Sequence, residues 1–181
     1  MSIHSLLEDH LASNPHISKD KHCVYQGDFL SKSKSFPFRS KFLDTRLAAG
    51  ENLLMHAGNN PKLPFPSLKS GIALTNYGLH FYTLRDSFFR TMMMYPWGAY
   101  GFVNFDDLKS LQFGDSDSCC GNQYEGHQLI VNDEVMGIVR MSNGLVYDEP
   151  AIVYCNQLFQ RMVGEFLEKP PSSDDYPGTL M

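Results

Sequence analysis

The densest group of reactive side chains in this 181-residue chain lies between residues 114 and 127. The segment reads GDSDSCCGNQYEGH, and its carboxylates, thiols and imidazole belong to Asp115, Asp117, Cys119, Cys120, Glu125 and His127. A small hydrolase could pair Asp117 or Cys119 with His127, because a nucleophile needs a base within hydrogen-bond reach. The many turn-forming residues favour the other interpretation, a polar loop between two strands of a hairpin.

The histidines, cysteines and carboxylates form no known metal motif. The seven histidines never occur as H-x-x-x-H or H-E-x-x-H, and the four cysteines form no C-x-x-C pair. Asp115 and Asp117 offer too few oxygen ligands for a calcium loop, which also needs a bidentate glutamate at fixed spacing. Phosphate-binding glycine loops and the G-x-S-x-G nucleophile motif are missing. We therefore expect neither metal nor cofactor, and binding rather than catalysis.

A second group of residues has the composition of a binding surface. Residues 92–100 read MMMYPWGAY and contain three methionines, two tyrosines and the only tryptophan. Methionine adapts its shape to a partner, and tryptophan and tyrosine supply large anchors. The predicted contact residues are Met92, Met94, Tyr95, Trp97 and Tyr100. We expect self-association or a protein partner here, unless residues 88–95 form a strand that is buried on both faces.

The basic residues suggest one weak alternative function, the binding of anionic lipid. Lys32, Lys34, Arg39 and Lys41 form a small basic cluster that could bind anionic lipid, although such runs are more often solvated. Residues 1–50 hold seven Lys/Arg against five Asp/Glu, whereas residues 51–181 hold eight against fifteen. Nucleic-acid binding needs clustered positive charge, so it is not expected, and membrane binding is disfavoured as well.

Cysteine use and hydropathy predict the compartment. Cys23, Cys119, Cys120 and Cys155 lack the spacing of a disulfide scaffold, which fits a reducing environment. Acidic residues interrupt the apolar start of the chain, so no export signal is expected. No window approaches the ~18 apolar residues that cross a bilayer. The sequence predicts a soluble cytoplasmic protein without a transmembrane segment.

Periodicity predicts the elements that must position these residues. Apolar residues at helical spacing predict a short helix over residues 3–11, followed by an irregular arm to residue 40. Two β runs at residues 71–75 and 79–84 flank Asn76-Tyr77-Gly78 and predict a hairpin, and residues 127–141 predict a second one. Further strands are expected at residues 51–57, 88–95, 100–105 and 108–113.

The clearest helix lies near the C-terminus. Asp148 or Glu149 can cap it, Pro150 fits its first turn, and its apolar residues recur at steps of three and four. Those residues are Ile152, Cys155, Phe159, Met162 and Phe166. The Pro- and Ser-rich tail after residue 168 is expected to be disordered.

About seven short strands in hairpin order and one closing helix form an α+β plan. In this order the chain resembles the bacterial pleckstrin-homology-like (PH-like) domains. The resemblance rests on GIALTNYGLHFYTL at residues 71–84, YGFVNFDDLKSLQF at residues 100–113, and the closing helix. It implies a roll or barrel of two roughly orthogonal antiparallel sheets capped by the C-terminal helix, with an extra N-terminal helix. The resemblance implies binding of peptides, lipids or further copies of the domain, and no catalytic residues.

The expected organisation is therefore an N-terminal helix and basic arm over residues 1–41, a PH-like β domain over 42–168, and a tail over 169–181. The leading hypothesis is a non-enzymatic binding or assembly module, with protein partners or self-association and a homo-oligomer as the outcome. The alternatives are a small enzyme that uses residues 114–127, with Asp117, Cys119 and His127, and weak lipid binding by the basic arm.

Overall fold

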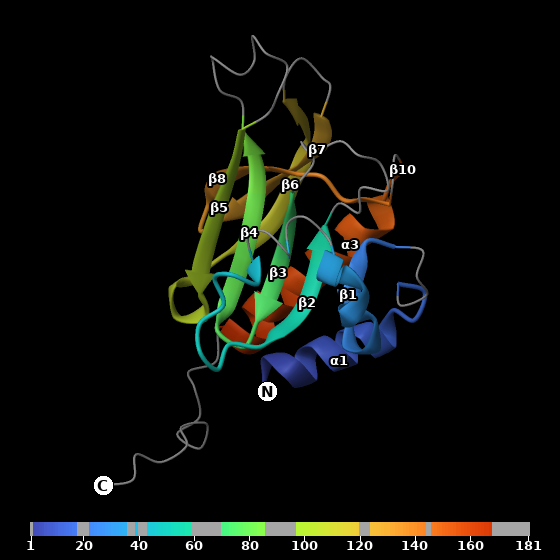
Figure 1. Ribbon diagram of the computed structural model, residues 1–181, viewed down its shortest axis with the longest axis vertical. Helices are drawn as coiled ribbons and strands as arrows, with labels where there is room; N and C mark the ends of the chain where they lie inside the picture. The colour runs from blue at the N-terminus through green and yellow to red at the C-terminus, as the bar shows by residue number, and fades with distance from the viewer. Residues whose placement is uncertain are drawn as a thin grey trace, which may run out of the picture.

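The computed structural model describes residues 2–17, 22–35, 39, 43–58, 70–85, 97–119, 124–143 and 146–167. The molecule is an α+β domain in which an antiparallel sheet curls into a half-barrel around a C-terminal helix (Figure 1). The strands of the main sheet are β1 (Val24–Gln26), β2 (Leu53–Gly58), β3 (Gly71–Thr75), β4 (Gly78–Arg85), β5 (Trp97–Asn104), β6 (Leu111–Cys119), β7 (Tyr124–Val131) and β8 (Glu134–Val139). A separate pair is formed by β9 (Ser142–Asn143) and β10 (Val146–Tyr147).

Strand pairing runs in the order β1-β2-β3-β4-β8-β7-β6, and β5 pairs with β4 beside this path. Among the described residues β4 pairs with β8 at Leu84 and Ile138, and the side chains of Thr83 and Arg85 donate to the carbonyl of Met136. Through this short pairing the sheet continues from the strands at the front of the molecule to β8, β7 and β6 behind them (Figure 1). The curl leaves a concave side that a helix can fill.

Both predicted hairpins are confirmed. Strands β3 and β4 pair in register from Gly71 opposite Tyr82 to Leu74 opposite Leu79. Between β7 and β8, Asn132 and Asp133 both have positive φ, 51° and 66°, which is the conformation of a tight primed turn. Local turn chemistry therefore accounts for the β7–β8 pair.

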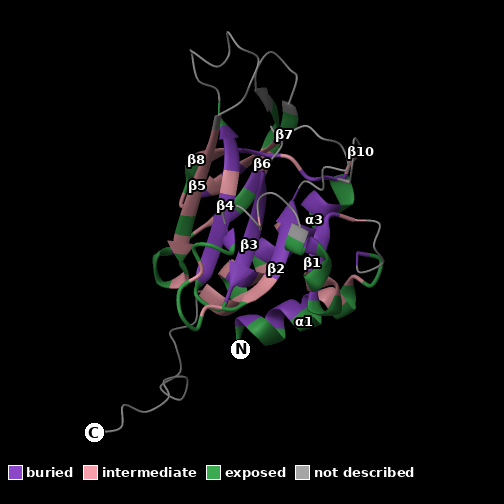
Figure 2. Ribbon diagram, in the orientation of Figure 1, coloured by how far each residue is buried: buried purple, intermediate pink, exposed green. Residues whose placement is uncertain are grey.

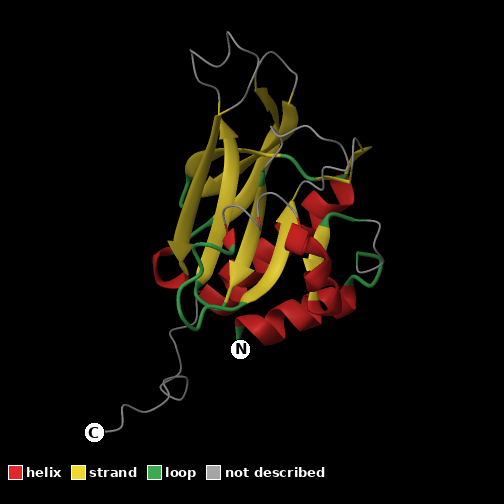
Figure 3. Cartoon of the chain, in the orientation of Figure 1, coloured by secondary structure: helices red, strands yellow, loops and turns green. Residues whose placement is uncertain are grey.

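The predicted closing helix is α3 (Glu149–Arg161), which continues as a π-helical segment over Met162–Leu167 (Figure 3). Asp148 is its N-cap, because its side chain accepts a hydrogen bond from the backbone N–H of Ala151. The predicted apolar face is confirmed: Ile152, Cys155 and Phe159 are buried against the sheet. The ring of Phe159 lies 5.5 Å from that of Phe113 on β6.

The predicted N-terminal helix is α1 (Ile3–Ser13), and its residues Ile3, Leu6 and Leu7 belong to the same core as α3 and the sheet. Figure 1 shows α1 across the lower end of the sheet. The arm predicted to be irregular contains strand β1 and a 3₁₀ helix over Gly27–Ser35, so that part of the prediction was wrong. The pairing of β1 with β2, a contact distant in sequence, orders this segment.

The segment of residues 114–126 was predicted as a loop, but β6 extends to Cys119 and β7 begins at Tyr124. The two strands pair past an irregularity between Phe113 and Ser116, so cross-strand hydrogen bonds override the polar sequence. The strand predicted over residues 88–95 and the tail after residue 168 lie outside the described residues. Within the described ranges, the helices are too short or too polar to cross a membrane.

Candidate functional site

The convex face of the sheet is covered by residues 43–52, which we call the strap. Leu43 is fully buried with Ala73 of β3, and Leu47, Leu53, Tyr82 and Tyr100 pack around them. The backbone N–H of Asn52 donates to Oδ1 of Asn76 at 2.6 Å, which ties the end of the strap to the β3–β4 turn. The strap therefore sets the environment of the outward-facing side chains of β4 and β5.

Beneath the strap, three side chains form a hydrogen-bonded chain. Oε1 of Glu51 lies 2.6 Å from Nε2 of His80, and Nδ1 of His80 lies 2.5 Å from the hydroxyl of Tyr100. The side chains of Glu51 and His80 are each 3% exposed. The carboxylate also accepts hydrogen bonds from the hydroxyl of Thr75 at 2.6 Å and the backbone N–H of Ala48 at 2.9 Å.

The protonation of this chain follows from its partners. Burial raises the pKa of Glu51, but the hydrogen bonds that its carboxylate accepts outweigh burial and hold the pKa below its usual value. An ionised carboxylate can only accept, so Nε2 of His80 carries a proton. In the neutral imidazole, Nδ1 then accepts the hydrogen bond from Tyr100. Burial raises the pKa of the Tyr100 phenol, against the effect of the Arg46 guanidinium that lies 4.5 Å above its ring.

A carboxylate, an imidazole and a hydroxyl in sequence can serve as a proton relay in a hydrolase. Here the imidazole is almost fully covered, and the raised pKa of Tyr100 makes the phenol a weaker nucleophile at neutral pH. The network instead holds the strap to the sheet and fixes the position of Tyr100 on β5. Sequence reasoning missed Glu51 and His80 because the two residues come together only when the strap folds over the sheet.

The strand that carries Tyr100 pairs on one side only, as far as the described residues go. β5 pairs with β4 from Trp97 opposite Arg85 to Asn104 opposite Gly78, and no strand pairs with its other side among the described residues. Figure 2 shows β5 in the colours of intermediate and exposed residues, beside the buried β3 and β4. Phe102 is 42% exposed. The edge therefore offers backbone hydrogen-bonding groups and an aromatic side chain to a partner.

The direction of those backbone groups can be derived from one hydrogen bond. The backbone N–H of Phe105 donates to the carbonyl of Tyr77 at 3.1 Å, in register with the β4–β5 pairing. Bonded and non-bonded pairs alternate along an antiparallel ladder, so the odd-numbered residues of β5 bond to β4. The N–H and C=O groups directed to the open edge belong to Gly98, Tyr100, Phe102 and Asn104.

Only part of the predicted binding stretch lies on this edge. Tyr100 and the backbone of Trp97 are in β5, but the side chain of Trp97 is outside the described residues. Met92, Met94 and Tyr95 are also outside the described residues, so their predicted contacts stay predictions. The structure adds Phe102, which is two residues along β5 from Tyr100 and therefore lies on the same strand face.

Of the residues of the enzyme alternative, the two whose side chains are described, Asp117 and His127, do not come together. Asp117 lies opposite Gly126 and His127 lies opposite Ser116, which places Asp117 and His127 on opposite faces of the β6–β7 ladder. Asp117 accepts a hydrogen bond from Nε2 of Gln128 at 2.7 Å, and Nδ1 of His127 donates to the carbonyl of Gly114 at 2.8 Å. The side chain of Cys119 is not described. This hairpin therefore supplies no Asp–His dyad.

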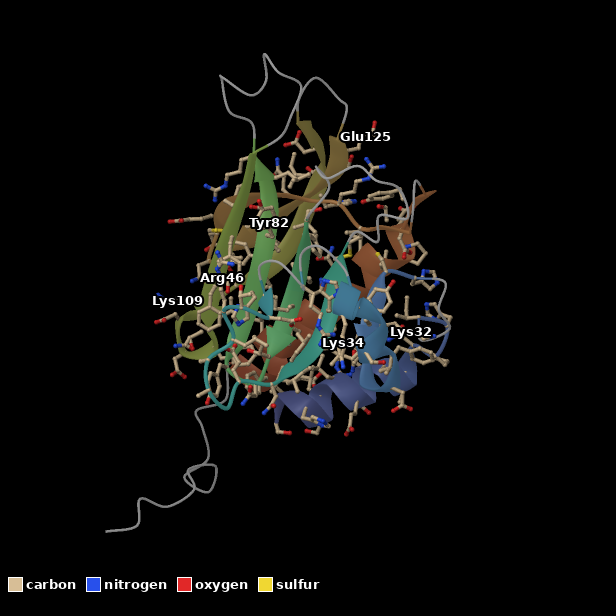
Figure 4. All side chains as sticks on the ribbon, in the orientation of Figure 1. Lys32, Lys34, Arg46, Tyr82, Lys109 and Glu125 are labelled. Atoms are coloured by element: carbon tan, nitrogen blue, oxygen red, sulfur yellow. The ribbon has the colours of Figure 1, made fainter. Side chains whose placement is uncertain are left out.

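The basic cluster is divided. Lys32 and Lys34 are exposed on the 3₁₀ helix (Figure 4). The guanidinium of Arg39 donates to the carbonyl of Leu30 and the hydroxyl of Ser33 and pairs with Asp44. Lys41 is outside the described residues. Arg39 therefore has a structural role in the described part of the arm.

A groove of about 430 Å³ lies between the end of α1 and the start of α3, and Val153, 49% exposed, contributes to its wall. Its other lining residues include Asn14, His16 and Gln157. One wall is helix α3, whose backbone groups are bonded internally, and the other is the turn that follows α1. Neither wall is a strand, so the groove offers no strand edge comparable to β5. Searches of family models, curated proteins and solved structures found no match to this chain.

Proposed function

We propose that this chain is a non-enzymatic protein-binding and assembly module that pairs an extended protein strand with the open edge of β5. The observation that carries the proposal is the unpaired side of β5 among the described residues, with its alternating N–H and C=O groups. Addition of a strand to a sheet edge is a recurrent mode of protein recognition, in which main-chain hydrogen bonds supply affinity. We assign the domain to the PH-like class on its hairpin order and closing helix.

The composition of the edge supports this function. β5 is eight residues long, reads WGAYGFVN, and contains no charged residue and no proline. Its pairing with β4 has no register shift, so no bulge turns the edge away. Proteins that avoid edge pairing use charges, prolines, bulges or short strands at such positions. An edge without these features is suited to accept a partner strand.

The buried network supports the function as well. Glu51 and His80 hold the Tyr100 hydroxyl, and Arg46 lies over the Tyr100 ring. A side chain that is fixed before binding loses less entropy when a partner arrives. The strap thus prepares one aromatic residue of the edge for contact.

The test uses a labelled peptide of sequence WGAYGFVN with lysines at both ends as a probe for an uncharged strand. Fluorescence anisotropy should detect its binding to the full chain at roughly micromolar protein. Phe102→Lys places a charge on the exposed edge and should weaken binding about tenfold, because edge lysines oppose strand addition. Val135→Lys is the matched control, since Val135 is 56% exposed on β8.

Binding that Phe102→Lys weakens and Val135→Lys leaves unchanged would support the proposal. If the peptide does not bind at a protein concentration at which the chain is monomeric, or if both variants bind it equally there, β5 is not a strand-binding edge and the proposal is wrong.

A further inference from the structure

We infer that the partner of β5 is a second copy of this chain, paired antiparallel about a twofold axis, with Tyr100 opposite Phe102 of the second copy. The inference rests on the proposed strand-binding function and names its partner. The two β5 strands would join the sheets of both copies into one continuous sheet.

Symmetry limits the possible registers. A twofold axis perpendicular to the sheet places the convex faces of both copies on the same side. Even-numbered residues of one β5 must therefore lie opposite even-numbered residues of the other. The open N–H and C=O groups also belong to the even-numbered residues, from Gly98 to Asn104. Each even–even pair can therefore exchange two backbone hydrogen bonds with its counterpart.

Among these registers, one uses the whole edge. With Tyr100 opposite Phe102, Gly98 lies opposite Asn104, and all four outward-directed residues find a partner within β5. A shift that places Tyr100 opposite Tyr100 leaves Asn104 facing residue 96, beyond the strand. The opposite shift, with Phe102 opposite Phe102, leaves Gly98 facing residue 106. The first register therefore makes the most backbone hydrogen bonds.

Side chains favour the same register. On the convex face it places an aromatic pair, Tyr100 with Phe102, on each side of the axis, and cross-strand aromatic pairs stabilise antiparallel strands. On the concave face Ala99 lies opposite Val103, and Gly101 lies opposite Gly101 on the axis. Gly101 has no room for a larger side chain, because a Cβ there would lie 2.2 Å from Cζ of Phe81. No residue of β5 carries a charge, so no like charges meet between the two paired strands.

Two measurements test the inference on the full chain. In sedimentation velocity at micromolar concentration the wild type should be a dimer, and Phe102→Lys should weaken dimerisation about tenfold, through loss of the two aromatic pairs. Val135→Lys should leave the dimer unchanged. Because Phe102 is 42% exposed, its replacement should not unfold the monomer, which circular dichroism can verify.

The second measurement tests the register. Odd-numbered residues form non-bonded pairs across the new interface, where Cα atoms lie about 4.5 Å apart, within the range of a disulfide. The double variant Ala99→Cys/Val103→Cys, with Cys119 and Cys120 replaced by serine, should therefore form a disulfide-linked dimer with mild oxidant. Each single-cysteine variant faces a residue without a thiol and should stay uncrosslinked.

A wild type that stays monomeric at high micromolar concentration would overturn the inference, even if the WGAYGFVN peptide binds, and β5 would then serve a different protein. A dimer that Phe102→Lys does not weaken would place the interface elsewhere. A dimer that Phe102→Lys weakens, but that the double-cysteine variant does not cross-link, would overturn the register. Failure of the peptide to bind to the monomeric chain would reject the proposed function itself, whereas exclusion of the peptide by a β5-paired dimer would not.

Discussion

The two faces of the curled sheet are built from the same strands but are stabilised in different ways. On the concave face Met55, Ile72 and Phe81 belong to one apolar core with α3. On the convex face the neighbouring residues in the same strands include His56 and His80, which are 1% and 2% exposed. The concave face thus buries hydrocarbon, whereas the convex face buries His56 and the Glu51–His80 pair beside a small apolar cluster around Leu43 and Ala73.

The difference shows what a covering element requires. An amphipathic helix can cover apolar side chains through area alone, whereas a strap of irregular backbone must satisfy its own hydrogen-bonding groups. Glu51 does this, because its carboxylate bonds to the strap at Ala48, to β3 at Thr75 and to β4 at His80. We expect the concave face to dominate stability and the convex face to determine its dependence on pH.

The largest expected effect lies on the concave face. Phe159 of α3 is fully buried, so Phe159→Ala should lower the free energy of unfolding by roughly 3–5 kcal/mol, as large-to-small changes in cores do. Urea unfolding measures this change. Val153→Ala is the control on the same helix and should change stability by less than about 0.5 kcal/mol, because Val153 is 49% exposed. A loss below about 1 kcal/mol for Phe159→Ala would show that α3 does not close the core.

Sequence reasoning predicted the concave face well and the convex face poorly. The helical spacing of Ile152, Cys155 and Phe159 is a local signal, and so is the Asn132-Asp133 turn. The Glu51–His80 pair joins residues from the strap and β4, and no spacing rule connects them. The outer part of the β6–β7 ladder was not predicted either, because it also depends on contacts between separate segments. Cross-strand pairing stabilises these strands although their composition favours a loop.

The candidate edge was predicted only in part. The concentration of aromatic residues near Tyr100 was visible in the sequence, and a partner contact was predicted from it. That β5 is an edge strand depends on the order of strands in the sheet, which periodicity does not encode.

The next effect concerns the pH dependence that the convex face introduces. Burial lowers the pKa of His56 to about 3, with a smaller contribution from Arg39, so the folded state holds this imidazole neutral. Between pH 6.5 and 3 the unfolded chain binds the additional proton, so stability falls as pH falls through this window. At pH 5 the loss from His56 should be about 2 kcal/mol relative to neutral pH.

Urea unfolding at pH 7 and pH 5 measures this loss, and His56→Gln should reduce it. His4→Gln is the control, because His4 is exposed on α1. Burial also lowers the pKa of His10, which lies under α3, so part of the pH dependence should persist in the His56 variant. An unchanged slope in His56→Gln would show that the convex face does not set the acid sensitivity.

The smallest expected effect comes from a change at Tyr100, which belongs both to the hydrogen-bonded network of the convex face and to the edge of β5. Substitutions there can distinguish the two roles. Tyr100→Phe removes the hydroxyl that bonds to His80 and keeps the ring that would face Phe102 of a second copy. It should cost about 1 kcal/mol of stability and leave self-association unchanged, because one hydrogen bond is lost and the aromatic pair is kept. Tyr100→Ala should lower both, as read by urea unfolding and sedimentation velocity. If Tyr100→Phe weakens the dimer as much as Tyr100→Ala does, the hydrogen bond to His80 is itself required for dimerisation. The convex-face network and the edge of β5 would then not be independent.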